Sequence, residues 1–186
     1  IGAGNGLSKK ILGKNILLTD IFKSPWIDLK VDMNSMKLSK KYLNKVDIFI
    51  FNHSLHHSNN PFDVLNKIKK YLKKGGLILI NDPEISFFFK LFLTICNHEM
   101  WTFKKNIWKD NNATAHILFH KKKYKSKFLK NYVIEKNELN EFLIFLNSGG
   151  NGVNSPYIPF NNFTLKIVKK IDNFFIFIAP KIFPLN

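Results

Sequence analysis

Short apolar runs alternate with a helical pattern in the first half of the chain, and this alternation most limits the folds available to it. Residues 46–51 (VDIFIF) and 77–81 (LILIN) are apolar runs with the length of buried strands. Between them, residues 62–74 (FDVLNKIKKYLKK) carry apolar residues at helical spacing, and Lys73, Lys74 and Gly75-Gly76 end this pattern as at a helix C-terminus. Strands that alternate with helices predict a parallel sheet covered by helices on both faces.

The other elements are expected on weaker patterns. We expect strands at 15–19, 27–31, 132–135 and 174–179, helices at 85–96, 138–147 and 164–171, a polar loop or insertion at 104–127, and a turn at 148–152. The resulting fold class is a doubly wound α/β domain with a mostly parallel seven-stranded sheet. The chain opens at Ile1-Gly2 without an initiator Met, so we expect it to be a fragment of a longer protein. The length of 186 residues predicts a single domain, 1–186.

Lysine alone supplies the positive charge of this chain. The net charge is +16, and all 29 basic residues are Lys, with no Arg. A basic excess is typical of nucleic-acid or membrane-surface binding, but Arg is the preferred residue for bidentate recognition of phosphate and guanine. We therefore favour a solvated lysine surface over a nucleic-acid partner.

Cysteine content and hydropathy exclude further classes. The single cysteine, Cys96, excludes a disulfide framework and a cysteine-built zinc site, and it is consistent with a cytoplasmic protein. No run of 18 apolar residues is present, so no spanning helix is expected. For the Phe-rich segment 85–96 we favour core packing. Its alternatives are the wall of an apolar substrate pocket or a peripheral membrane contact beside Lys90.

The first six residues, IGAGNG, place glycine at every second position ahead of a short helical pattern. Glycine lets the backbone turn sharply after a strand and approach a ligand closely, and a following helix directs its N–H groups toward that ligand. The spacing departs from the dinucleotide-binding form, which requires glycine where this chain has Leu7. A tight strand-to-helix turn without a ligand is the alternative interpretation.

Polar side chains end the three apolar runs that follow. Asp20 could accept hydrogen bonds from ribose hydroxyls, and Asp32-Met33 could bind and cover an adenine ring, while Asn52-His53 ends the next run. Ligands of open parallel sheets bind beyond the carboxyl ends of the strands. Taken singly, each Asp is more simply a turn or helix-cap residue.

Together these residues resemble the class I S-adenosylmethionine-dependent methyltransferases (methyltransferase type 11-like). The resemblance covers about 1–84, including the segment from Lys45 to His57 and the segment PFDVLNKIKKYLKKGGLILIND at 61–82. It implies a cofactor half at about 1–84 and an acceptor-specific half at about 85–186. It also implies S-adenosylmethionine as cofactor, bound by Gly2, Ala3, Gly4, Asn5, Gly6, Asp20, Asp32, Met33, Asn52 and His53.

The resemblance implies methyl transfer, in which the enzyme mainly aligns a nucleophile and excludes water. His98-Glu99 and 148–150 resemble a branch of bacterial methyltransferases that acts on small molecules or surface sugars, so we expect such an acceptor. The candidate bases are His56, His98 and Glu99, and Asp82, Glu84 and His98 are candidates for substrate contact. For His56 and His57, packing beside the cofactor is favoured over catalysis, and for His98-Glu99 a surface or capping role is favoured. The spacing His53-x-x-His56-His57 lacks carboxylate or cysteine partners, so we expect no metal.

Three alternatives remain open at this point. The lysine excess suggests an RNA methyltransferase, although no RNA-binding module is recognisable. The absence of an unambiguous base suggests a cofactor-binding protein of the same fold without turnover. A nicotinamide-dependent oxidoreductase is disfavoured because of Leu7. No obligate protein partner is evident from the sequence.

Overall fold

The computed structural model describes residues 1–4, 6, 9, 12–13, 15–95, 100–140, 142–143 and 158–184. The chain divides into two compact units, Ile1–Asp82 and Pro83–Asn186. The expectation that both halves form one domain stays a prediction.

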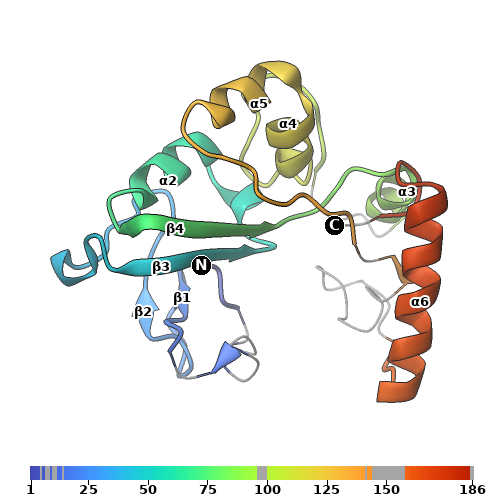
Figure 1. The fold of residues 1–186 in the computed structure, drawn as a ribbon, viewed down its shortest axis with the longest axis horizontal. Helices are drawn as coiled ribbons and strands as arrows, with labels where there is room; N and C mark the ends of the chain where they lie inside the picture. Colours follow the sequence, from blue (N-terminus) through green and yellow to red (C-terminus); the bar gives the residue numbers. More distant parts are fainter. Residues whose placement is uncertain are drawn as a thin grey trace. The chain divides into compact units, whose positions relative to one another are not determined.

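Two pairs of parallel strands form the sheet layer of the first unit (Figure 1). β1 (Thr19–Asp20) pairs with β2 (Leu29–Lys30), and β3 (Val46–Asn52) pairs with β4 (Leu72–Asn81). Residues 1–3 lie between the two pairs, because the Ala3 N–H donates to the Thr19 carbonyl (3.0 Å) and the Ile1 nitrogen donates to the Ile50 carbonyl (2.8 Å). The parallel α/β architecture is therefore confirmed, whereas the described residues contain these four strands and do not confirm a seven-stranded sheet.

One α-helix and two 3-10 helices connect the strands of this unit. η1 spans Lys40–Tyr42, η2 spans Leu55–His57 and α2 spans Pro61–Ile68. α2 begins where the Asn60 side chain accepts a hydrogen bond from the Phe62 N–H (3.0 Å), with Pro61 in the first helical position. Its apolar side is buried, as the helical spacing predicted.

The helix ends six residues earlier than the predicted end at residue 74. The carbonyls of Lys70 and Tyr71 accept hydrogen bonds from Asn44, Lys45 and Val46, so they cannot continue a helix. Gly75 and Gly76 consequently lie inside β4, where the pairing shifts from Val46–Leu72 to Ile48–Leu77. The prediction of a helix C-cap was wrong. The two glycines lie instead at the register shift between β3 and β4.

The two faces of the β3–β4 pair differ in burial. Phe49 and Phe51 are buried, whereas Ile48, Leu77 and Leu79 on the opposite face are exposed. Side chains of a strand alternate between faces, so one face carries the core and the other is open. Among the described residues, the prediction that helices cover both faces is not met for this pair.

The second unit is helical in its described residues. It contains α3 (Phe87–Ile95), α4 (Thr114–His120), α5 (Lys122–Leu129) and α6 (Asn162–Ile178). Phe88, Phe142, Phe175 and Phe183 form a cluster of neighbouring rings, with centroids 4.9–6.0 Å apart. α3 confirms the helix expected at 85–96, and its residues Phe89 and Leu93 are buried in the core.

Several expectations for this half were wrong. Residues 104–127 contain α4 and most of α5 rather than a continuous loop, and 132–135 is not a strand. Residues 174–179 were expected as the last strand but belong mostly to α6, because the apolar run continues the helical pattern begun at Asn162. Half of the helix expected at 138–147 (residues 141 and 144–147) and the whole turn expected at 148–152 lie outside the described residues.

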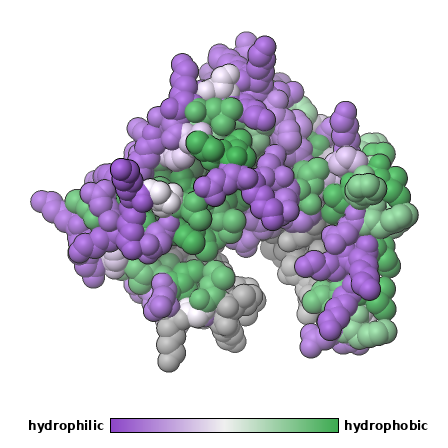
Figure 2. Space-filling model, in the orientation of Figure 1, coloured by the Kyte–Doolittle hydropathy of each residue, from purple (hydrophilic) through white to green (hydrophobic). Residues whose placement is uncertain are grey.

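The lysine-rich part of α5 is solvated. Lys122, Lys123, Lys125 and Lys127 are exposed while Phe128 is buried, and Figure 2 shows a hydrophilic surface over this helix. Within the described part of the chain, no helix has both the length and the apolar character needed to cross a membrane.

Candidate functional site

The glycine turn at the start of the chain adopts a conformation that favours glycine. Gly2, Gly4 and Gly6 have φ values of 67°, 49° and 76°, a region that strains residues with a Cβ. At Gly4 an added Cβ would meet nothing within 4 Å, whereas at Gly6 it would lie 2.5 Å from Cδ1 of Trp26. The turn therefore presents bare backbone at Gly4 and is tightly covered at Gly6.

Asp20 joins this turn to the end of β1. Its Oδ2 accepts a hydrogen bond from the Gly4 N–H (3.0 Å), and its Oδ1 accepts one from the Phe22 N–H (3.0 Å). An ionised carboxylate has about four acceptor positions, so each oxygen retains capacity for a further donor. Two ribose hydroxyls are donors of the kind that such a carboxylate accepts.

Trp26 is a neighbour of the turn that sequence reasoning missed. Its Nε1–H donates to the Gly4 carbonyl (2.6 Å), and its ring covers Gly6. The side chain is half exposed. No pattern in the sequence marks Trp26, because the contact depends on the path of the loop between β1 and β2.

The segment after β2 places Asp32 and Met33 one strand away from Asp20. β1 and β2 are in parallel register, with Asp20 opposite Lys30, and the Val31 N–H donates to the Asp20 carbonyl (2.8 Å). Asp32 forms a local turn in which its Oδ1 accepts from the Asn34 N–H (2.8 Å). The turn interpretation of Asp32 is thus correct, and it leaves the second carboxylate oxygen for other donors.

The end of β3 carries Asn52 and His53 beside the end of β4. Asn81 donates from its side chain to the Asn52 Oδ1 (2.8 Å), and the His53 N–H donates to the Asn81 carbonyl (2.7 Å). His53 has a φ of 46°. Burial lowers the pKa of His53 below its usual 6.5, and the nearby Asp82 carboxylate opposes this shift in part.

Directly beyond these strand ends, Asp82 and His56 form a buried pair. Asp82 Oδ1 lies 3.0 Å from His56 Nδ1 and accepts a second hydrogen bond from the Ser54 N–H (3.0 Å). Ser54 also contacts the glycine turn, since a Cβ on Gly2 would lie 2.6 Å from the Ser54 Cβ. The pair therefore connects the end of β4 with the segment that supports the turn.

The structure does not show the remaining candidate residues from the sequence at the strand-end site. Glu84 belongs to the second unit, where it contacts His116 and His120. Asn5, His98 and Glu99 lie outside the described residues.

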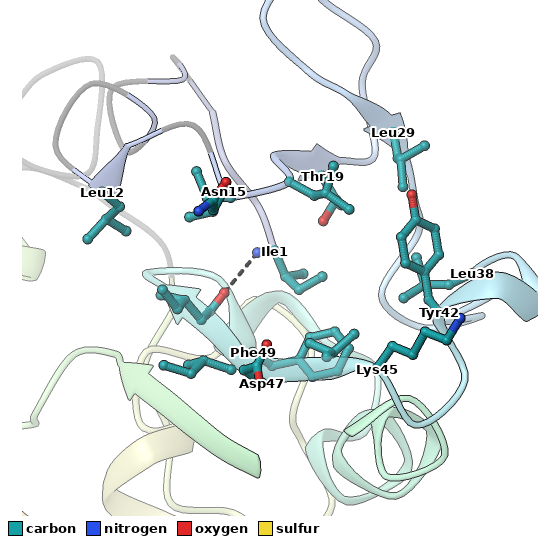
Figure 3. A pocket seen from close by; sticks show the side chains of 15 residues that line it. Ile1, Leu12, Asn15, Thr19, Leu29, Leu38, Tyr42, Lys45, Asp47 and Phe49 are labelled. Carbon is teal, nitrogen blue, oxygen red and sulfur yellow. Dashed lines mark hydrogen bonds between the residues drawn. The ribbon is translucent and has the colours of Figure 1, made fainter. Parts of the chain in front are cut away.

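A separate cavity of about 510 Å³ lies in the first unit (Figure 3). Its wall includes Thr19 of β1, Leu29 of β2 and five consecutive residues of β3, Val46–Ile50. Consecutive residues point to alternate faces, so the cavity is bounded by the edge of β3 as well as one face. The wall contains neither Gly4, Asp20 nor Asp32, so this cavity is distinct from the strand-end site.

A parallel α/β layer with a glycine turn and carboxylates at its strand ends is typical of Rossmann-like proteins. The model of a family described as "Methyltransferase domain" matches residues 29–146, which is more than half of the chain. The chain therefore belongs to the class I S-adenosylmethionine-dependent methyltransferases. The glycine turn and Asp20 precede the matched range.

Comparisons with curated proteins and with solved structures gave no match.

Proposed function

We propose that this protein binds S-adenosylmethionine at the glycine turn and transfers its methyl group to a small-molecule or glycan-type acceptor. The observation that carries the proposal is the hydrogen bond from the Gly4 N–H to Asp20 Oδ2 (3.0 Å). It brings the bare backbone of the turn and the acid of the next strand end into one site, at the edge where parallel sheets bind ligands.

The chain's own groups suit the parts of this cofactor. The backbone of residues 2–6 would lie against it, and Asp20 would accept hydrogen bonds from the ribose hydroxyls. Asp32 and Met33 would bind and cover the adenine, with Asn52 and His53 flanking them from β3. The cofactor supplies a methyl group already activated by a sulfonium.

The burial of His56 bears on its role. Only 2% of the residue is exposed, and Asp82 fixes its Nδ1 side. A group so enclosed is better suited to positioning the strand-end region than to direct proton transfer with a substrate. We therefore assign His56 and Asp82 a positioning role, and His98, Glu99 and Glu84 remain candidates for the acceptor side.

The cofactor assignment is tested by calorimetric titration with S-adenosylhomocysteine. We expect binding to the wild-type protein and a loss of at least about tenfold in affinity in Asp20→Ala, because hydrogen bonds to a charged group contribute about 1.5–3 kcal/mol. Emission from Trp26 should change on binding, and this change should be absent in Trp26→Phe.

Asp47→Ala is the matched control for Asp20→Ala. Asp47 is an exposed carboxylate on β3 that pairs with Lys73 (2.6 Å) and makes no hydrogen bond to the described residues of the glycine turn. Its replacement should leave the affinity unchanged. Absence of binding to the wild-type protein, or equal affinities in Asp20→Ala and the wild type, would remove the assignment.

A second experiment separates the acceptor classes. Release of S-adenosylhomocysteine with small-molecule or glycan fractions of a cell extract supports the proposal, and turnover with RNA alone supports an RNA methyltransferase. RNA binding through lysines would also weaken steeply with added salt. Cofactor binding without turnover in any fraction would indicate a non-catalytic protein of this fold.

A further inference from the structure

Two histidines and a glutamate converge within the second unit. The ligand atoms of Glu84, His116 and His120 all lie within 4.8 Å of one another. Among the described residues, this is the only group of three or more His, Cys, Asp or Glu side chains that is so closely gathered. The sequence did not predict it, because 32 residues separate Glu84 from His116.

Helical geometry places the two histidines on one side of α4. His116 and His120 are four residues apart, and their ring centroids are 5.0 Å apart. Residues at this spacing are neighbours on a helix surface, so both rings can reach one ion. The helix thus presents two nitrogen ligands without any contribution from flexible loops.

Glu84 completes the set with oxygen. Its Oε1 contacts His116 Nδ1 directly, and its Oε2 lies 3.5 Å from His120 Nε2. Only 14% of the Glu84 side chain is exposed, and its ion-pair partners within the described part of the chain are these two histidines. The two carboxylate oxygens therefore face one histidine nitrogen each.

We propose that Glu84, His116 and His120 form a binding site for a divalent cation of the zinc class. Zinc binds imidazole nitrogen at about 2.0–2.1 Å and carboxylate oxygen at about 2.0–2.2 Å, with tetrahedral geometry. Tetrahedral ligands at such bond lengths lie about 3.3 Å apart, close to the separation of His120 Nε2 and Glu84 Oε2, whereas Glu84 Oε1 and His116 Nδ1 are in direct contact and would have to separate to admit the ion. A set of two histidines and one carboxylate favours zinc over magnesium or calcium, which prefer oxygen ligands.

The set leaves one coordination position for a ligand from solution. Three protein ligands with an open fourth position are typical of sites that bind water or a substrate oxygen. The His120 side chain is 42% exposed, so solvent has access from its side. The site would thus hold a cation with one exchangeable ligand, and this inference stands independently of the proposed cofactor site.

Zinc titration of the chelator-treated protein, followed by calorimetry, tests the site. We expect one Zn²⁺ per chain and a loss of at least about tenfold in affinity in His120→Gln and in Glu84→Gln. Co²⁺ in place of Zn²⁺ should give the intense visible absorption of a four-coordinate site, and both variants should lose it. His120 is partly exposed and Glu84→Gln preserves shape, so circular dichroism should show both variants folded.

His57→Gln is the matched control, since His57 belongs to the first unit and is not in the cluster. It should bind Zn²⁺ with wild-type affinity. The proposal is overturned if the wild-type protein binds no Zn²⁺, if His120→Gln and Glu84→Gln bind it as tightly as the wild type, or if only His57→Gln weakens binding.

Discussion

The carboxylate of Asp82 lies 3.0 Å from the Nδ1 atom of His56, and both side chains are almost completely buried. The same oxygen accepts the Ser54 N–H, so one atom of Asp82 satisfies two buried donors. Asp82 follows β4 and His56 lies in η2, so the contact fixes two segments that come from neighbouring strand ends. A buried polar pair therefore connects the segments that follow these two strand ends.

Replacement of Asp82 by alanine should destabilise the protein strongly. The Ser54 N–H and the His56 ring nitrogen would lose their acceptor, and a buried donor without a partner costs about 1–3 kcal/mol. We expect Asp82→Ala to lower the free energy of unfolding by about 2–4 kcal/mol, measured by urea denaturation.

Asp47→Ala provides the comparison for this experiment. Asp47 also carries an ion pair, but it is 72% exposed, and exposed pairs contribute about 0–1 kcal/mol. If Asp82→Ala lost no more unfolding free energy than Asp47→Ala, the buried contacts of Asp82 with His56 and Ser54 would be contradicted.

Alanine at Gly6 should be costly for two separate reasons. The φ of 76° strains a residue with a Cβ by about 1–2 kcal/mol, and the new atom would overlap the Trp26 ring. We expect Gly6→Ala to lose about 2–4 kcal/mol of unfolding free energy in urea denaturation, with the larger share due to the overlap.

Gly13 separates the two contributions. It has a φ of 85°, but an added Cβ would meet nothing within 4 Å, so Gly13→Ala should cost only about 1–2 kcal/mol. In a Trp26→Ala background, Gly6→Ala should cost no more than Gly13→Ala. An unchanged cost of Gly6→Ala in that background would refute the contact with Trp26.

His53 should make the stability fall in mild acid. Burial lowers the pKa of His53 in the folded state, so the unfolded chain, with a pKa near 6.5, binds a proton more readily. The contribution of neutral His53 is therefore present above pH 6.5 and is lost as the pH falls through the lowered pKa.

The variant His53→Asn tests this dependence. Asparagine tolerates a φ of 46°, so the substitution removes the titration without adding backbone strain. Urea denaturation between about pH 8 and pH 5 should show a smaller loss of stability in the variant than in the wild type. Equal slopes, or a His53 NMR titration midpoint above 6.5, would contradict the assignment.

The first unit was predictable where the pattern was local and repetitive. The long apolar run of β3 and the helical spacing of α2 were read correctly, and Asp20 was placed at a strand end. The end of α2 was missed because tertiary pairing of Lys70 and Tyr71 with the start of β3 competes with the helix. No local pattern contains that competition.

The structure of the second unit was harder to predict from the sequence for a related reason. The segment 174–179 (FFIFIA) has the composition of a strand, but it continues α6 because the preceding residues had already set the helical period. The convergence of Glu84 with His116 and His120 requires chain segments that are distant in sequence. Such contacts are set by tertiary structure and leave no spacing to recognise.

Asn111 shows how the polar segment taken for a loop gains its order. Its side-chain amide donates to the carbonyls of Thr102 (3.0 Å) and Ile107 (2.7 Å). Its Oδ1 accepts from the N–H groups of Thr102 (3.0 Å) and Ala113 (3.1 Å). With an exposure of 0%, this one amide replaces the backbone pairing that a regular element would provide before α4.

Asn111→Ala should consequently lose more stability than an ordinary polar substitution. Two backbone N–H groups and two carbonyls would be left without their partner, and we expect a loss of about 3–5 kcal/mol in urea denaturation. Amide hydrogen exchange should also accelerate between residues 100 and 113. Asn137→Ala, at an exposed position of the same unit, should change neither observable by more than a small amount. If Asn111→Ala behaves like Asn137→Ala, the segment before α4 must derive its order from its apolar contacts, such as those of Trp108, and not from the amide.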